Sequence, residues 1–279
     1  MRKTGLIALL AVVVALPALA QLKLPRASQH AVLTQTVGLT DITITYSRPG
    51  VKGRKIFGGL VPYGQVWRTG ANEATTIAFS DDVTINGQPL PKGTYSLHSI
   101  PGESEWTLIF NKTADQWGSY SYDPKQDALR INVKPLHSEK SAEWLTFSTP
   151  ELSTDTATFQ LHWDTVRVPF TVNTHATEKA IAAARAAVAA AKPDDFRTAY
   201  SAALFASDNN FTKEANEWID ASIKVKETLG NLYGKARILA AEGKKAEAIK
   251  TAEKALTLAT DKDKVVADEI RSRIELWKK

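Results

Sequence analysis

The period of the hydrophobic pattern changes once along this chain, near residues 173–177, and this change limits the fold more than any other feature. Before it, apolar and β-branched residues recur at every second position, as in HAVLTQTV (30–37), which is the spacing of half-buried strands. After it, alanine-rich segments such as ATEKAIAAARAAVAAAK carry apolar residues at helical spacing. We therefore expect a β domain over residues 21–172, a linker over 173–177 and a helical domain over 178–279.

Strand-like segments follow one another at near-regular spacing in the first half. Asn86-Gly87 lies within VTINGQPL and favours a two-residue hairpin, because both residues tolerate positive φ. Other alternating segments are DITITYS, LPKGTYSLHSI, EWTLIF, DALRINVKP, AEWLTFSTP, TATFQLHWD and TVRVPFTV, the last two taken as separate strands. About ten short strands without a helical pattern between them predict an antiparallel β-sandwich.

The second half contains an internal repeat. Residues 207–223 align without gaps on residues 240–256, at an offset of 33 residues, close to the roughly 34 of tetratricopeptide repeats. Ala215 matches Ala248, and small residues there let paired helices approach closely. We predict a tetratricopeptide-like stack of α-helical hairpins, with Thr177 as the N-cap of its first helix. Two roles stay open for this stack: it docks a protein partner, or it supports the β domain.

The first twenty residues have the three parts of a secretion signal. Arg2 and Lys3 precede an apolar run over 6–16, and residues 18–20 form an A-x-A cleavage site. The run is too short to cross a bilayer comfortably, which takes about 20 residues. We expect cleavage before Gln21, a periplasmic or secreted protein, and no membrane span after cleavage. A retained membrane anchor is the alternative.

Composition excludes several classes of site. The chain has no cysteine, so disulfides and cysteine-based catalysis are ruled out. Its formal charge of +5, or +3 once Arg2 and Lys3 are removed, is too small to indicate a nucleic-acid partner. The five histidines are scattered, without metal-binding spacing, and the chain has no Walker, dinucleotide or nucleophile-elbow motif. We expect neither a metal nor a cofactor.

One stretch between strand-like segments, residues 46–80 (the basic loop), has neither strand nor helix period in its middle. Long segments of this kind are usually functional or disordered. Ile56, Phe57 and Trp67 are among the apolar residues that it can bury, which argues against disorder. The basic loop also holds five basic residues and one acid. We therefore expect the binding site of the protein here.

The cations of the basic loop suit an oxyanion, because guanidinium groups bind carboxylate, sulfate and phosphate through two hydrogen bonds. Aromatic residues would supply flat apolar walls, and a neighbouring amide and carboxylate would orient the ligand. The candidate binding residues are Arg48, Arg54, Lys55, Tyr63, Trp67, Arg68, Asn72 and Glu73. This set predicts a binding module for an anionic small molecule or a glycan.

Two alternatives stay open for the same residues. In a hydrolase or lyase, Glu73 would move a proton with a basic partner, although a glutamate among cations is ionised and a poor acid. Asp115 is the nearest suggestion for a second carboxylate. In a purely structural or interaction protein, Arg48, Arg68 and Glu73 form a salt-bridge network that clamps the loop to the sandwich.

A second group of aromatic residues lies in the polar turn ADQWGSYSYD. Trp117, Tyr120 and Tyr122 either form a platform for carbohydrate or cover the edge of the core. Trp106, in the alternating segment EWTLIF, is expected in the core.

Several long motifs of the first half resemble a family of exported bacterial proteins. They are KLPRAS, TYSRPGVKGRKIFGGLVPYGQVWRTGANEATTI, LPKGTYSLHSIPGESEWTLIFNK and DQWGSYSYDPKQDALR, in this order. The family is catalogued as domain of unknown function 2911 and is common in the Bacteroidetes, and the resemblance covers roughly residues 24–172. The resemblance implies export and a compact β domain, and it implies no activity, substrate or catalytic residue. Relatives tend to have an aromatic residue where this chain has His98.

Overall fold

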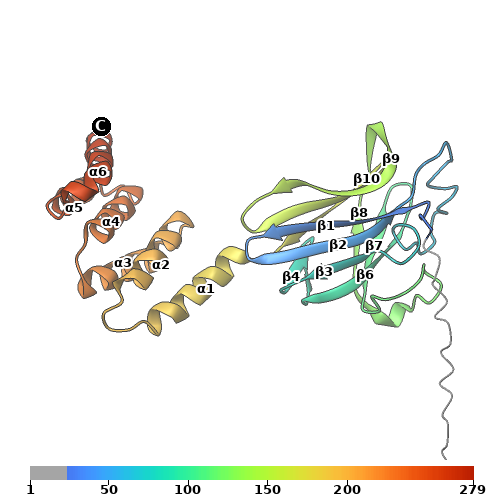
Figure 1. Cartoon of the computed structure of the whole chain (residues 1–279), viewed down its shortest axis with the longest axis horizontal. Coiled ribbons are helices and arrows are strands. Elements are labelled where there is room, and N and C mark those ends of the chain that lie inside the picture. Colours follow the sequence, from blue (N-terminus) through green and yellow to red (C-terminus); the bar gives the residue numbers. More distant parts are fainter. Residues whose placement is uncertain (1–23) are drawn as a thin grey trace, which may run out of the picture.

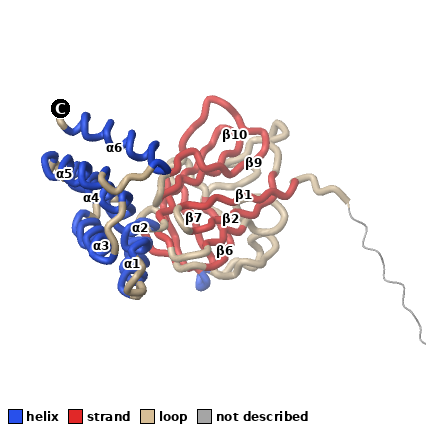
Figure 2. The backbone as a smooth tube through the Cα atoms, turned by 60° about the vertical axis from the view of Figure 1, so that its left-hand side comes forward, coloured by secondary structure: helices blue, strands red, loops and turns tan. Residues whose placement is uncertain are grey.

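The computed structural model describes residues 24–279, so the expected signal peptide, its cleavage site and Gln21 lie outside the described residues. Figure 1 shows a β domain followed by a chain of helices that leads away from it. In the turned view of Figure 2 the helices again gather on one side of the strands. Within the described part of the chain, no helix is both long enough and apolar enough to cross a membrane.

Six antiparallel strands form the larger sheet, in the order β1-β2-β3-β6-β7-β8. Their bounds are β1 Gln29–Val37, β2 Thr40–Arg48, β3 Thr76–Phe79, β6 Gly93–Ile100, β7 Trp106–Asn111 and β8 Asp127–Val133. The alternating pattern of β2 explains why one face of this strand packs on the core, because successive side chains point to opposite faces. Ile42 and Ile44 are fully buried, whereas Asp41 is exposed. A short 3-10 helix, η1 (Pro124–Gln126), precedes β8.

Four antiparallel strands form the second sheet, in the order β5-β4-β10-β9. Their bounds are β4 Val83–Ile85, β5 Gln88–Leu90, β9 Leu136–Leu152 and β10 Thr156–Asn173. The predicted hairpin turn is confirmed, since Asn86 and Gly87 both have positive φ between β4 and β5. The prediction of two separate strands in 156–172 is wrong. The polar pair at 164–165 resembles a turn, but Asp164 adopts a positive φ at a register shift and the strand continues.

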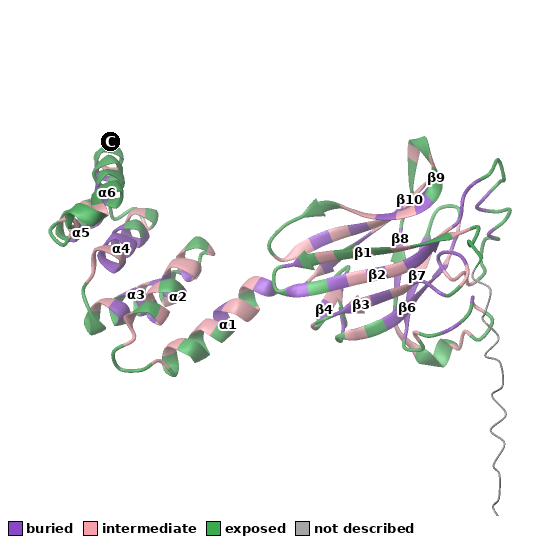
Figure 3. Ribbon diagram, in the orientation of Figure 1, coloured by how far each residue is buried: buried purple, intermediate pink, exposed green. Residues whose placement is uncertain are grey.

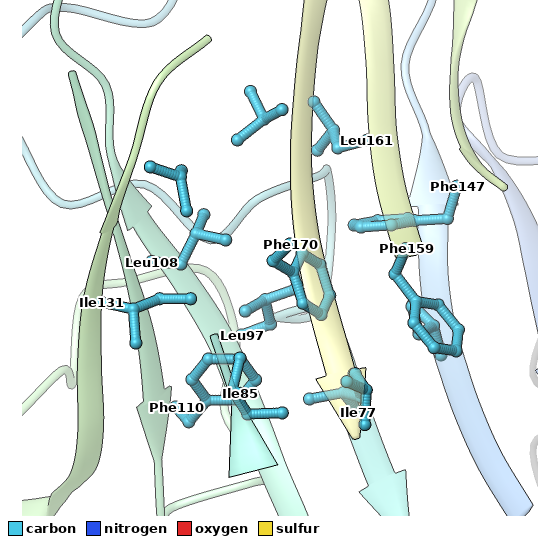
Figure 4. Packing of buried hydrophobic residues seen from close by; sticks show 14 of the residues in the cluster. Ile77, Ile85, Leu97, Leu108, Phe110, Ile131, Phe147, Phe159, Leu161 and Phe170 are labelled. Carbon is cyan, nitrogen blue, oxygen red and sulfur yellow. The ribbon is translucent and has the colours of Figure 1, made fainter. Parts of the chain in front are cut away.

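The two sheets pack face to face, as the predicted β-sandwich requires. Leu97 and Phe110 from the larger sheet meet Phe159 and Phe170 from the smaller one (Figure 4). The rings of Phe159 and Phe170 stack with centroids 5.8 Å apart, and Phe110 meets Phe170 edge-on at 6.1 Å. Trp106 is buried in the same core, as its strand pattern predicts.

Six helices follow the β domain and pack in pairs, like hairpins. Their bounds are α1 Ala176–Ala189, α2 Phe196–Asp208, α3 Thr212–Val225, α4 Leu229–Ala241, α5 Lys245–Leu256 and α6 Lys264–Trp277, with a 3-10 helix η2 at Asp261–Asp263. Helix α2 packs on α3, and α4 packs on α5. The first helices of the two hairpins, α2 and α4, begin at residues 196 and 229, which are 33 residues apart. The second helices, α3 and α5, begin at residues 212 and 245, again 33 residues apart. The repeat seen in the sequence is therefore the structural repeat, and Ala215 and Ala248 are both fully buried in it.

The helices begin directly at the sandwich, because β10 ends at Asn173 and α1 begins at Ala176. Burial continues from the strands into the first turn of α1 (Figure 3). The prediction that Thr177 is the N-cap is wrong, since the helix begins earlier and His175 precedes it. Asp155, in the β9–β10 turn, caps this end from outside by accepting hydrogen bonds from N and Oγ1 of Thr177 at 2.7 and 2.9 Å.

Candidate functional site

The basic loop connects β2 to β3 at the end of the sandwich opposite the helices (Figure 1). Its apolar residues fold inward, and Ile56, Phe57 and Val61 are buried. Phe57 meets the core edge-on, with its ring centroid 4.9 Å from that of Trp106 and 6.0 Å from that of Trp163. The loop is thus anchored to the core, and its polar residues are held at fixed places above it.

A cavity of about 350 Å³ lies beneath the basic loop (the basic-loop cavity). Its polar and aromatic lining consists of Ser28, Lys52, Arg54, Gln65, Trp67, Arg68 and Trp163. Three of these residues are cations, and no carboxylate of the described chain lines the cavity. The rings of Trp67 and Trp163 stack at its base, with centroids 5.8 Å apart. Of the predicted site residues, the structure brings Arg54, Trp67 and Arg68 to this cavity.

Arg68 is half-buried in the wall of the basic-loop cavity, and no carboxylate of residues 24–279 pairs with its charge. Its Nε is buried and has no hydrogen-bond partner within residues 24–279, and the same holds for Nε1 of Trp163. Burying a donor without a partner costs free energy, so such groups are few in folded proteins. Two residues of the cavity lining therefore each carry a buried N–H group that has no acceptor among residues 24–279.

The side chains of the other two predicted arginines, Arg54 and Arg48, donate hydrogen bonds to other residues of the protein. Arg54 donates from Nε and Nη2 to the carbonyl oxygens of Val51 and Gly50, at 3.0 and 2.5 Å. Arg48 lies outside the cavity lining and donates from Nε to the carbonyl oxygen of Leu145 at 2.8 Å and from Nη2 to Thr146 Oγ1 at 2.5 Å. Arg48 thus links β2 to β9 across the two sheets.

Glu73 pairs with Arg26 and not with Arg68, so the alternative network of Arg48, Arg68 and Glu73 does not form. Both carboxylate oxygens of Glu73 accept from Nη1 of Arg26, each at 2.7 Å. This hydrogen bond is the main cause that lowers the pKa of Glu73. Arg26 lies in the KLPRAS motif before the first strand, far from Glu73 in sequence, which is why the pattern of the loop alone did not identify it.

Glu73 lines a second cavity, of about 580 Å³, together with Arg26, His30, Asp115 and Gln116. The structure thus brings Asp115, the second carboxylate suggested for a hydrolase or lyase, to the same cavity as Glu73. Glu73 is half-exposed and stays ionised beside Arg26. It is therefore a poor proton donor near neutral pH.

The remaining predicted residues lie around the basic-loop cavity and not in its lining. Lys55 is exposed, and Tyr63 packs its ring over Gly58, where a methyl group would approach the ring to 2.7 Å. Asn72 has a positive φ and donates from Nδ2 to the carbonyl oxygen of Ser28 at 3.2 Å. It holds the segment before β1 against the basic loop, a structural role.

The sequence did not single out four residues that line the cavity: Ser28, Lys52, Gln65 and Trp163. Lys52 was counted among the basic residues, but nothing in its surroundings separates it from Lys55. Trp163 belongs to the inward-facing positions of β10, so its alternation predicted core. Its second role at the cavity follows only from the position of the loop above it.

His98 on β6 is fully buried, and neither ring nitrogen has a hydrogen-bond partner among the residues described. Its ring lies edge-on to Tyr122, with centroids 5.1 Å apart. Burial lowers the pKa of His98 to about 4, so the ring is neutral near pH 7. In the part of the chain that the structure describes, no three His, Asp or Glu side chains are grouped so as to hold a metal ion.

Comparison with known proteins gives a family and no nearer relative. A search of curated proteins found no match, and a search of solved structures found none. One family profile matches residues 28–172, which is more than half of the chain and covers the β domain with the basic loop. The helices lie beyond this match. The chain therefore belongs to the family described as protein of unknown function (DUF2911).

Proposed function

We propose that this protein is exported and binds a small molecule that carries an oxyanion group, in the basic-loop cavity. The observation that supports the proposal is the state of Arg68. Its guanidinium lies at the cavity wall, half-buried, with an Nε that no described residue satisfies. A carboxylate, sulfate or phosphate group in the cavity would supply the opposite charge and hydrogen-bond acceptors for this guanidinium.

The surroundings of Arg68 strengthen this argument. Lys52 and Arg54 line the same cavity, so its lining carries three positive charges, which attract an anion. The two backbone carbonyls that bind Arg54 fix its guanidinium in place, so an entering anion meets a cation whose orientation is already set. Arg68 itself is half-buried, which strengthens its attraction for a bound anion.

A binding module accounts for the site better than a hydrolase or lyase does. Proton transfer near neutral pH needs an acid or base with a pKa near that of the solution. Glu73, the proposed proton carrier, has a lowered pKa and is held by Arg26 at a separate cavity. The basic-loop cavity itself has donors and cations in its lining and no carboxylate from residues 24–279.

Titration calorimetry with sodium sulfate and with galacturonate at low ionic strength tests the proposed function. Arg68→Gln keeps a polar side chain and removes the charge, and we expect it to weaken binding roughly 10- to 100-fold, the effect of losing one charge-assisted hydrogen bond. Lys55→Gln is the matched control, since Lys55 is an exposed cation of the same loop outside the lining. Equal affinities for wild type and Arg68→Gln would refute the proposal.

Export is tested separately by sequencing the N-terminus of the protein recovered from its native host. We expect the mature chain to begin at Gln21, after the A-x-A site. A retained Met1 in the membrane fraction would contradict export as a released protein.

A further inference from the structure

Four aromatic side chains of the described residues are exposed, and all four lie on or against the basic loop. Tyr63, Trp117, Tyr120 and Trp144 are exposed by 40, 58, 84 and 40 %. Tyr63 belongs to the loop, Trp117 forms a backbone bridge with Glu73, and Trp144 forms one with Gly50. Contiguous apolar patches mark binding sites more often than scattered side chains do, and of these four Trp117 and Tyr120 belong to one turn.

The turn that carries Trp117 and Tyr120 is fixed to the basic loop through its backbone. The N–H of Gly118 donates to the carbonyl oxygen of Asn72 at 3.2 Å, and the N–H of Ala74 donates to that of Gln116 at 3.0 Å. The guanidinium of Arg26 lies 5.9 Å from the centroid of the Trp117 ring and also holds Glu73. The backbone of the turn is therefore held against the basic loop, while the rings of Trp117 and Tyr120 are open to solvent.

Gly118 places the aromatic turn directly beside the cation of the proposed site. A methyl group at Gly118 would lie 2.9 Å from the ring of Tyr120 and 3.4 Å from Nη1 of Arg68. The exposed ring of Tyr120 and the guanidinium of Arg68 thus lie on either side of the backbone at Gly118. On another wall, a methyl group at Gly50 would lie 2.9 Å from Oε1 of Glu143 and 3.2 Å from the ring of Trp144, and Gly50 itself lines the basic-loop cavity.

Open aromatic faces next to a cationic cavity fit a ligand that has both flat apolar faces and an acid group. A pyranose ring presents a face of C–H groups that packs on an aromatic ring, and a uronic acid or a sulfated sugar adds the oxyanion. We propose that the ligand is an acidic oligosaccharide whose acid group binds at Arg68 and whose next sugar units pack on Trp117 and Tyr120. This inference rests on the proposed function, since it places the acid group in the basic-loop cavity.

Single-stranded nucleic acid also combines stacking faces with negative charge. It is the less favoured occupant, because a phosphate chain needs a track of cations along its backbone. Here Lys52, Arg54 and Arg68 converge on one cavity of about 350 Å³, and the formal charge of the whole chain is only +5.

Calorimetry on the full chain distinguishes these ligands. The probes are galacturonate, its trisaccharide, a sulfated galactose trisaccharide, neutral maltotriose and a five-nucleotide thymidine strand. The variants are Trp117→Ala and Tyr120→Ala, with Leu152→Ala as a matched control. Leu152 has the same exposed fraction as Trp117, 58 %, and ends β9, next to the β9–β10 turn that caps α1.

We expect an acidic trisaccharide to bind at least roughly tenfold more tightly than galacturonate, and maltotriose not to bind. Each aromatic variant should lose roughly three- to tenfold of the affinity for the trisaccharide while galacturonate binds as before; Leu152→Ala should change neither. The carboxylated and sulfated trisaccharides show which acid group the site prefers.

Two results would overturn the inference and are distinct from failure of the proposed function. If both acidic trisaccharides bind no more tightly than galacturonate, while Arg68→Gln still weakens sulfate binding, the cavity holds a small anion and the aromatic turn takes no part. If the thymidine strand binds more tightly than either trisaccharide and depends on Trp117, the ligand is a nucleic acid. If neither sulfate nor galacturonate binds, the proposed function and this inference both fail.

Discussion

Arg48 and Arg68 are the same residue type in one loop, and their surroundings give them different roles. Arg48 donates two hydrogen bonds to residues of β9. The Nε of Arg68, in contrast, has no hydrogen-bond acceptor within the described residues. No local pattern could separate them, because the partners of Arg48 lie about a hundred residues further along the chain. The loop could be predicted from sequence, but the role of each cation within it could not.

Chemical unfolding should reveal this difference between the two arginines. Arg48→Ala is expected to lower the free energy of unfolding by about 2–3 kcal/mol, because it removes charge-assisted hydrogen bonds from a half-buried position. Arg68→Ala is expected to change it by no more than about 0.5 kcal/mol, since its side chain has no hydrogen-bond or ion-pair partner among residues 24–279. A larger loss for Arg68→Ala than for Arg48→Ala would show that Arg68 is the structural residue.

His98 should make the β domain lose stability in mild acid. Its pKa is near 6.5 in an unfolded chain and about 4 in the folded protein, because burial disfavours the charged ring. Between these values the unfolded state binds more protons, so stability falls as the pH falls from 6.5 to 4, by about 3 kcal/mol. Above pH 6.5 both states hold a neutral ring and the effect vanishes.

Urea unfolding of wild type and His98→Phe at pH 4, 5, 6 and 7 measures this effect. The difference in unfolding free energy between them should shift in favour of His98→Phe as the pH falls. His30→Gln, at an exposed histidine, serves as a control for the loss of a histidine that is not buried. A difference between wild type and His98→Phe that stays constant over this range would contradict burial of a neutral His98.

The sequence pattern predicted those helices and strands whose formation depends on residues close together in the chain. Alternation located the strands, and the repeat located α2 to α5 with the observed offset of 33 residues. The errors arose where distant residues act. Asp155 from another turn caps α1 in place of Thr177, and Arg26 binds Glu73 in place of Arg68. Asp164 reads as a turn residue, but its neighbours on β9 keep the strand paired.

The cap that Asp155 supplies gives a test at this scale. Asp155→Ala should lower the free energy of unfolding by about 1–2 kcal/mol, because the N-terminus of α1 loses a capping carboxylate. Asp194→Ala, at an exposed aspartate in the turn before α2, should change it little. Thermal unfolding followed by circular dichroism measures both, and equal midpoints for Asp155→Ala and wild type would show that α1 does not depend on this cap.

For the whole molecule, the buried cores suggest two folding units. The sandwich core takes its members from residues 37–172, and the two helical clusters take theirs from residues 181–274. The described contacts between the two parts are local to the start of α1, among them the ion pair of Lys179 and Asp81 at 2.6 Å. Such contacts position the helices and add little to the stability of the sandwich.

We therefore expect residues 21–172, expressed alone, to fold. Urea unfolding followed by tryptophan fluorescence should show one cooperative transition, because the fragment retains the whole sandwich core. The basic-loop cavity should survive in it, since every lining residue lies within the fragment. A fragment that is unfolded while the full chain is stable would show that the helices complete the core, and their role would then be support.

The central claim is that an oxyanion binds at Arg68, and a crystal structure grown with selenate tests it most directly. Selenium scatters anomalously, so the position of the anion can be located independently of the protein. The account predicts a selenate within hydrogen-bonding distance of the Arg68 guanidinium in the wild type, and none there in Arg68→Gln. Selenate absent from the basic-loop cavity of the wild type, or present there equally in Arg68→Gln, would contradict it.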